Sequence, residues 1–218
     1  MTVTKKITRG VLCGLCTLTF AVPAHAQDAP AISLRPFAAL AFERFTATDT
    51  FSSVFGKDTG WFYGGGLQVT FHDRIYVELS ASRFREDGNR VFRDSSGRVF
   101  YLGIPLTATL TPLELVGGYR FHPDRYHWLV PYAGAGVGWY RYQETSPFAN
   151  PGDDIDTRHA GFVAHGGAEF RVHRWMGLAA DLQYTHVTGI LGTAGISADV
   201  DETDLGGLAG RFTIVIGK

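Results

Sequence analysis

Charged side chains that could do chemistry recur on one face of several apolar segments. Each belongs to a stretch in which apolar and polar residues alternate, which is the pattern of a half-buried strand. The acidic members are Glu78, Glu114, Glu169 and Asp181, and the basic members are Arg120, Arg171 and Arg211. Where such faces converge, paired charges stabilise each other and an unpaired charge costs several kcal/mol. The set therefore predicts ion pairs inside the fold, which form either a structural plug or a polar path for ions.

A histidine and a hydroxyl group two residues apart, His186 and Thr188, raise the question of nucleophilic catalysis. The spacing resembles that of PagL-type lipid A deacylases, which place a histidine and a serine in this way on a late strand. Here threonine replaces the serine, and Gly189-Ile190 follows it instead of Ser-Asn. A nucleophile also needs a group that orients its base, and the sequence identifies none. We therefore name no catalytic residue and expect no enzyme, with a lipid A-modifying enzyme as an alternative.

Acidic runs offer oxygen ligands for Ca²⁺ or Mg²⁺. One comprises Asp153, Asp154 and Asp156, and the other comprises Asp199, Asp201, Glu202 and Asp204. The second run lacks the glycine and the distal glutamate of a helix-loop-helix calcium site. The runs are interpreted as solvated loops, and the sequence predicts neither a metal site nor a cofactor.

These residues belong to eight segments with period-two alternation. The predicted strands are 33–45, 61–72, 74–82, 113–121, 129–142, 162–173, 178–185 and 208–216. Charges collect on one face of seven of them, and the facing of the first strand is ambiguous. Aromatic residues gather near the strand ends: Trp61, Tyr63, Tyr119, Phe121, Trp128, Trp139, Tyr140, Trp175 and Tyr184. Uncharged faces with aromatic residues at both ends are typical of a transmembrane barrel, because only a closed sheet can pair its backbone groups in a bilayer.

The connections alternate strictly between short and long. The short ones are 72–74, 122–127 and 173–174, whereas the long, polar ones are 46–60, 84–104, 143–158 and 187–204. Outer-membrane barrels have this asymmetry, with short periplasmic turns and longer outward loops. Both ends of the barrel should thus lie on the short-turn side, and the second long loop should extend as a hairpin around residues 94–97.

The composition excludes two classes of protein, and the first residues indicate how the chain is targeted. A net charge of −1, 19% charged residues and 13% aromatic residues in 218 argue against a disordered chain and against a nucleic-acid binder. A signal peptide is predicted over residues 1–26 from a basic segment at 1–9, an apolar stretch at 10–22 and the small residues of Ala24-His25-Ala26. Both cysteines, Cys13 and Cys16, lie within it. Residues 27–218 then form a single barrel domain. A soluble lipocalin-like barrel is the alternative, with the two faces reversed.

Three motifs carry a resemblance to the small OmpA/OmpX-like outer-membrane β-barrels, over the whole of residues 27–218. They are PYAGAGVG at 131–138, GYRF at 118–121 and DLQYT at 181–185. The chain departs from that family in its last residues, because its final aromatic is Phe212 rather than the terminal residue. The resemblance implies an eight-stranded antiparallel up-and-down barrel in the bacterial outer membrane. We take the barrel to be a monomer by default and expect it to contact outer-membrane lipid, with a structural or surface-binding role through the four long loops. A small ion-conducting pore is the alternative function.

Overall fold

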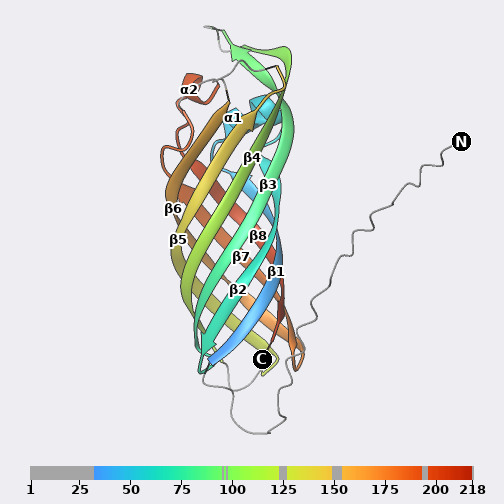
Figure 1. Cartoon of the computed structure of the whole chain (residues 1–218), viewed down its shortest axis with the longest axis vertical. Coiled ribbons are helices and arrows are strands. Elements are labelled where there is room, and N and C mark those ends of the chain that lie inside the picture. Colours follow the sequence, from blue (N-terminus) through green and yellow to red (C-terminus); the bar gives the residue numbers. More distant parts are fainter. Residues whose placement is uncertain are drawn as a thin grey trace, which may run out of the picture.

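The computed structural model describes residues 32–94, 96, 98–122, 127–148, 154–192 and 196–217. In this part of the chain, eight antiparallel strands follow one another around a closed barrel in which β1 pairs with both β2 and β8 (Figure 1). The strands are β1 (Ile32–Phe45), β2 (Thr59–Phe71), β3 (Ile75–Arg93), β4 (Val99–Arg120), β5 (Leu129–Thr145), β6 (Ile155–His173), β7 (Met176–Val187) and β8 (Leu205–Ile216). The predicted up-and-down barrel is confirmed. The predicted signal peptide, residues 1–26, lies outside the described residues.

Alternation along each strand separates a polar interior from an apolar exterior. Glu78, Glu114 and Arg211 are buried inside, whereas Leu79, Leu113 and many other large apolar residues are exposed on the outer face. The structure also resolves the facing of β1, the strand that the sequence left ambiguous. Arg35, Phe37, Glu43 and Phe45 of that strand are buried, and Leu34, Leu40 and Phe42 are exposed.

Aromatic residues mark both ends of this apolar exterior. Trp61, Tyr63, Trp139 and Tyr184 are exposed toward the long-loop end, and Tyr119, Phe121, Trp128 and Trp175 are exposed toward the short-turn end. Their placement fits the interfacial girdles of a membrane barrel. The prediction was wrong for Tyr140, which is buried because its position in β5 points inward.

The β2–β3 turn is tight because two consecutive residues adopt left-handed backbone conformations. His72 has φ 49° and Asp73 has φ 55°, and the N–H of Arg74 donates to the carbonyl of Phe71 at 3.0 Å. Two positive φ angles match the twist of a two-residue hairpin. This turn lies at the same end of the barrel as the C-terminus (Figure 1).

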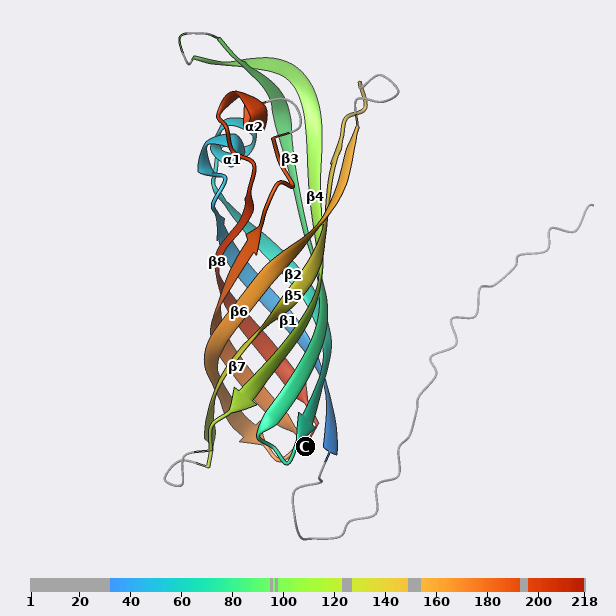
Figure 2. The same cartoon turned by 90° about the vertical axis from the view of Figure 1, so that its left-hand side faces the viewer.

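The long-loop end is more ordered than the sequence predicts. Within residues 84–104, β3 continues to Arg93 and β4 begins at Val99, so this segment is the expected hairpin rather than a loop. The hairpin rises far above the barrel and curves over helices α1 (Thr48–Phe55) and α2 (Ile196–Asp199) (Figure 2). Residues 143–145 and 155–158 are likewise strand. Among the described residues, neither helix is long and apolar enough to cross a membrane.

Helix α1 was not predicted from the sequence, because the contacts that stabilise it come from distant residues of the chain. Its N-cap residue, Ala47, makes no capping hydrogen bond through a side chain. The Glu202 carboxylate takes that role, since it accepts the N–H groups of Asp49 at 3.1 Å and Thr50 at 2.8 Å. The helix thus carries no local start signal, and it depends on a residue about 150 positions later in the chain.

Small residues inside the barrel make room for large ones. Tyr76 is fully buried, and a Cβ atom added at Gly118 would overlap its ring and approach the carbonyl oxygen of Ala133 to 2.5 Å. Gly134, on the next strand, would likewise place a Cβ atom against the Tyr76 hydroxyl group. The adjacent Gly117 points outward and has nothing within 4 Å of that position. The inward glycines therefore determine where Tyr76 lies.

We expect Gly118→Ala to lower the free energy of unfolding by about 1–3 kcal/mol, because the barrel wall cannot move away from the Tyr76 ring. Gly117→Ala is the matched control and should leave stability unchanged or raise it by about 0.5 kcal/mol. Urea unfolding of the barrel folded in lipid vesicles, followed by tryptophan fluorescence, measures both. Equal effects of the two substitutions would contradict this packing account.

Candidate functional site

The short-turn half of the lumen is filled by a carboxylate between two arginines. Arg35 donates to both oxygens of Glu169, at 3.0 and 2.5 Å, and Arg120 contacts the same carboxylate at 3.0 Å. Both guanidinium groups also donate to the side-chain oxygen of Gln68, at 3.0 and 3.1 Å. All four residues are buried. Because Arg35 and Arg120 bind the same two partners, no side chain of the group can move away without leaving another buried polar group unpaired. The group therefore forms a rigid plug.

A second group is centred on Arg211 in the middle of the barrel. Its guanidinium contacts Glu78 at 3.0 Å and Asp181 at 2.9 Å, and it donates to Nδ1 of His165 at 2.8 Å. Because Nδ1 accepts, the proton of a neutral His165 lies on Nε2, which donates to the Tyr76 hydroxyl oxygen at 2.7 Å. The Gln68 amide joins the two groups by donating to Glu78 at 3.2 Å. The polar lumen is therefore one continuous network.

Two buried carboxylates above this network lack a cation. Glu114 accepts hydrogen bonds from the Tyr140 hydroxyl at 2.7 Å and the Gln183 amide at 3.2 Å. Glu43 makes no hydrogen bond or ion pair with any residue that the structure describes. With Arg211, both line a cavity of about 50 Å³, which has room for a few water molecules.

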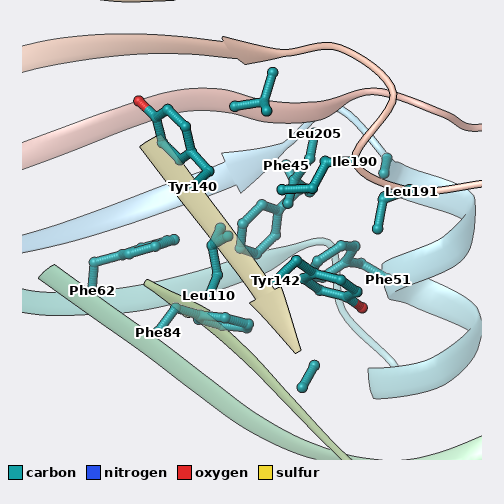
Figure 3. Close-up of a cluster of buried hydrophobic side chains, with 13 residues drawn as sticks. Phe45, Phe51, Phe62, Phe84, Leu110, Tyr140, Tyr142, Ile190, Leu191 and Leu205 are labelled. Atoms are coloured by element: carbon teal, nitrogen blue, oxygen red, sulfur yellow. The ribbon is translucent and has the colours of Figure 1, made fainter. Parts of the chain in front are cut away.

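The long-loop half of the lumen is closed by an apolar cluster, which we call the apolar plug. Figure 3 shows its side chains converging from the barrel wall and from α1. Phe45 stacks on Phe51 with ring centroids 4.1 Å apart, and Phe84 stacks on Phe62 at 5.3 Å. The full cluster comprises Phe45, Ala47, Phe51, Phe62, Phe84, Ala108, Leu110, Tyr140, Tyr142, Val187, Ile190, Leu191 and Leu205. Nearly all side chains of this layer are apolar, so an ion that crossed it would lose its water with few ligands to replace it.

The structure brings six of the seven predicted ion-pair residues into the buried lumen: Glu78, Glu114, Arg120, Glu169, Asp181 and Arg211. Arg171 instead lies at the short-turn rim, where its side chain is 37% exposed and pairs with Asp73 at 2.5 Å. It has the inward position of its strand, but it lies beyond the end of the filled lumen. Arg120 reaches the same Asp73 from inside, at 3.5 Å.

Sequence reasoning missed Arg35, Gln68 and His165 as members of the network. Arg35 was missed because the facing of the first strand was ambiguous. His165 and Gln68 occupy inward positions of recognised strands, so the alternation itself carried the signal. The apolar plug was missed because its residues come from seven strands, from the connections after β1 and β7, and from a helix with no local start signal.

His186 and Thr188 are close but do not form a catalytic arrangement. Thr188 Oγ1 lies 3.3 Å from His186 Nε2, and Asp204 lies 3.8 Å from the same nitrogen. A base that takes a proton on one ring nitrogen needs its orienting carboxylate at the other nitrogen. Here both neighbours compete for Nε2, so the geometry does not activate Thr188.

The acidic runs are used as structural acceptors in the outer loops. Besides Glu202 at α1, Asp204 accepts the N–H of Gly189 at 3.0 Å, and Asp156 binds Arg141 at 2.8 Å. Asp153 lies outside the described residues. In the described part of the chain, no three metal-ligating side chains come together.

This distribution of side chains suits a membrane and not water, because the apolar face is the one turned outward while charges are sealed inside. The molecule is thus a transmembrane β-barrel. Residues 14–211 match the family described as the outer membrane protein beta-barrel domain. The chain belongs to this family and is an integral β-barrel protein of the bacterial outer membrane.

Three solved outer-membrane barrels are similar to this structure at low sequence identity. Neisserial surface protein A is 13% identical, with a TM-score of 0.52 over 85% of this chain and 96% of that one. The N-terminal barrel of Pseudomonas aeruginosa OprF is 15% identical, with a TM-score of 0.48 over 85% and 97%. E. coli outer membrane protein W is 20% identical, with a TM-score of 0.46 over 87% and 98%. No curated protein matches the sequence.

Two buried glutamates in the same lumen allow a direct test of the network. Glu78→Gln should lower the free energy of unfolding by about 3 kcal/mol, because it removes the negative charge that faces Arg211. Glu43→Gln is the matched control and should change stability by less than about 1 kcal/mol, because no cation loses its partner. Urea unfolding in lipid vesicles measures both. A larger loss for Glu43→Gln than for Glu78→Gln would contradict the assigned pairing.

Proposed function

We propose that this protein acts by presenting a folded surface outside the cell, with the barrel as its anchor. The presented structure, which we call the crown, consists of α1, α2 and the β3–β4 hairpin beyond Leu106 and Gly88. The proposal assigns it a binding role, without turnover and without conduction. The expected contacts are with outer-membrane lipid and with a partner at the outer loops.

The observation that carries this proposal is that the crown has a core of its own. Val54 of α1, Leu106 of β4 and Ile196 of α2 are buried together, and Phe55 and Val91 pack against them. Loops that only join strands have no need of a core, and ordering them costs about 1–2 kcal/mol of backbone entropy per residue. An ordered crown is therefore suited to recognition, since a partner need not order it again.

The hairpin carries apolar residues beyond this core. Phe92 pairs with Phe100, and Val91 pairs with Tyr101, across the two strands. Tyr101 is 66% exposed, and Phe92, Phe100 and Leu102 are also exposed. An exposed apolar patch on a water-facing structure commonly marks an interaction surface. A cavity of about 450 Å³ beside it, lined by Phe55, Leu102 and Tyr142 among others, adds a recess in the same region.

The sealed lumen supports anchoring over conduction. An ion would meet the apolar plug on the outer side and a network of charge pairs on the inner side. A barrel of eight strands has an interior only wide enough for side chains. The competition of Thr188 and Asp204 for one nitrogen of His186 supports a non-catalytic role in the same way.

Attachment of bacteria that carry the protein tests the proposal. Phe100→Ser with Tyr101→Ser should reduce cell-to-cell and cell-to-surface attachment toward the level of cells lacking the protein, because the apolar patch is lost. Phe148→Ser is the matched control, since Phe148 is 73% exposed on the β5–β6 loop, outside the hairpin. Attachment that is unchanged in the double variant, with equal surface amounts, would overturn the hairpin as the binding surface.

Planar-bilayer recordings separate the anchor from the pore alternative. We expect no discrete current steps from the wild type or from Arg120→Gln, because the apolar plug remains intact when the lower network is weakened. A pore would instead give steps in the wild type whose size changes with Glu114→Gln. Such steps would contradict the sealed lumen.

A further inference from the structure

Four arginines occupy neighbouring outward positions on one side of the barrel. Arg83 and Arg85 lie on β3, Arg141 on β5 and Arg158 on β6, and all four point away from the lumen. Arg141 is directly opposite Arg158 and also pairs with Thr111 of β4. The register on either side of residues 82–83 places Arg83 level with that same threonine. The arginines therefore form one patch across four adjacent strands, which lie side by side in Figure 1.

Apolar and aromatic residues lie next to this patch on the same outer face. Tyr63 pairs with Arg83, and Trp139 precedes Arg141 by two residues on its strand. Trp139 pairs with Leu113, and all three of these neighbours are exposed. Aromatic residues of this kind mark the level where hydrocarbon gives way to headgroups. The arginine patch thus lies at the outer headgroup level of the membrane.

The patch contains more positive than negative charge. Asp156 binds Arg141, and Asp87 accepts a hydrogen bond from Thr107 at 2.6 Å. Arg83 and Arg85 make no hydrogen bond or ion pair with any residue that the structure describes. The opposed guanidinium groups of Arg141 and Arg158 add a repulsion that one carboxylate must offset. An anion from outside the protein would remove this imbalance.

We propose that the arginine patch is a binding site for the phosphate groups of an outer-leaflet glycolipid. Guanidinium groups match phosphate with two parallel hydrogen bonds, and they do so at the depth where lipid phosphates lie. The exposed rings of Tyr63 and Trp139 would contact the acyl chains or sugars of the same lipid. The arginines are spread over several adjacent strands, so the patch can bind a headgroup that carries two separated phosphates. This inference is independent of the crown, because it concerns the outer wall of the barrel.

Native mass spectrometry of the folded barrel tests the site with three probes. These are lipid A with two phosphates, the same lipid with its phosphates removed, and phosphatidylglycerol. The bisphosphorylated lipid should bind most tightly. Arg83→Gln with Arg85→Gln should weaken its binding by about tenfold or more, since each arginine near an anionic surface contributes on the order of a fivefold factor.

A double variant at the opposite rim is the matched control. Arg74→Gln with Arg174→Gln removes the same charge from two exposed residues near the short turns and should leave binding unchanged. Heat-dependent gel mobility confirms that each variant is folded. Equal binding of the dephosphorylated lipid or of phosphatidylglycerol, or equal losses in the two double variants, would overturn the proposal.

Discussion

The constraint on which the rest of the structure depends is that a bilayer offers backbone N–H and C=O groups no partner. Pairing β1 with β8 satisfies it, and closure with only eight strands leaves an interior that side chains must fill. The lumen therefore has to be packed like a protein core, although every second side chain of its strands faces the lipid instead. A polar group without a partner is costly in such an interior.

The two halves of the lumen meet this requirement differently. Toward the short turns and in the middle of the barrel, Glu169 and Arg211 each bind several partners, so the charges neutralise one another in place. Toward the long loops, aromatic rings exclude water instead. Glu43 lies between the charge network and the apolar plug. It is buried there without a hydrogen bond or an ion pair to any described residue. Because side chains fill the interior of the barrel, contacts with other molecules are left to its two outer surfaces. These surfaces are the crown and the lipid-facing wall.

Period-two alternation was enough to predict the strands, their order and most of the buried charges, and the turn residues at 94–97 predicted the hairpin. Alternation works because each strand is amphipathic by itself, and a register shift of one residue would expose every charge. It failed at β1, where alanines and phenylalanines occur on both faces, and at Arg171, because alternation gives a direction and not a depth. Alternation could not predict the helices or the apolar plug, because both depend on contacts between segments far apart in the chain.

Glu202 couples the two ends of the chain. It lies just before β8, whereas the helix it caps follows β1. The first outer loop can therefore take its final form only after the last hairpin has arrived, which is also the event that joins β8 to β1. A partly assembled barrel would lack both its last seam and the cap of its first loop. Completion of the wall and completion of the outer surface are one step, so any barrel that displays a finished crown is also a closed one.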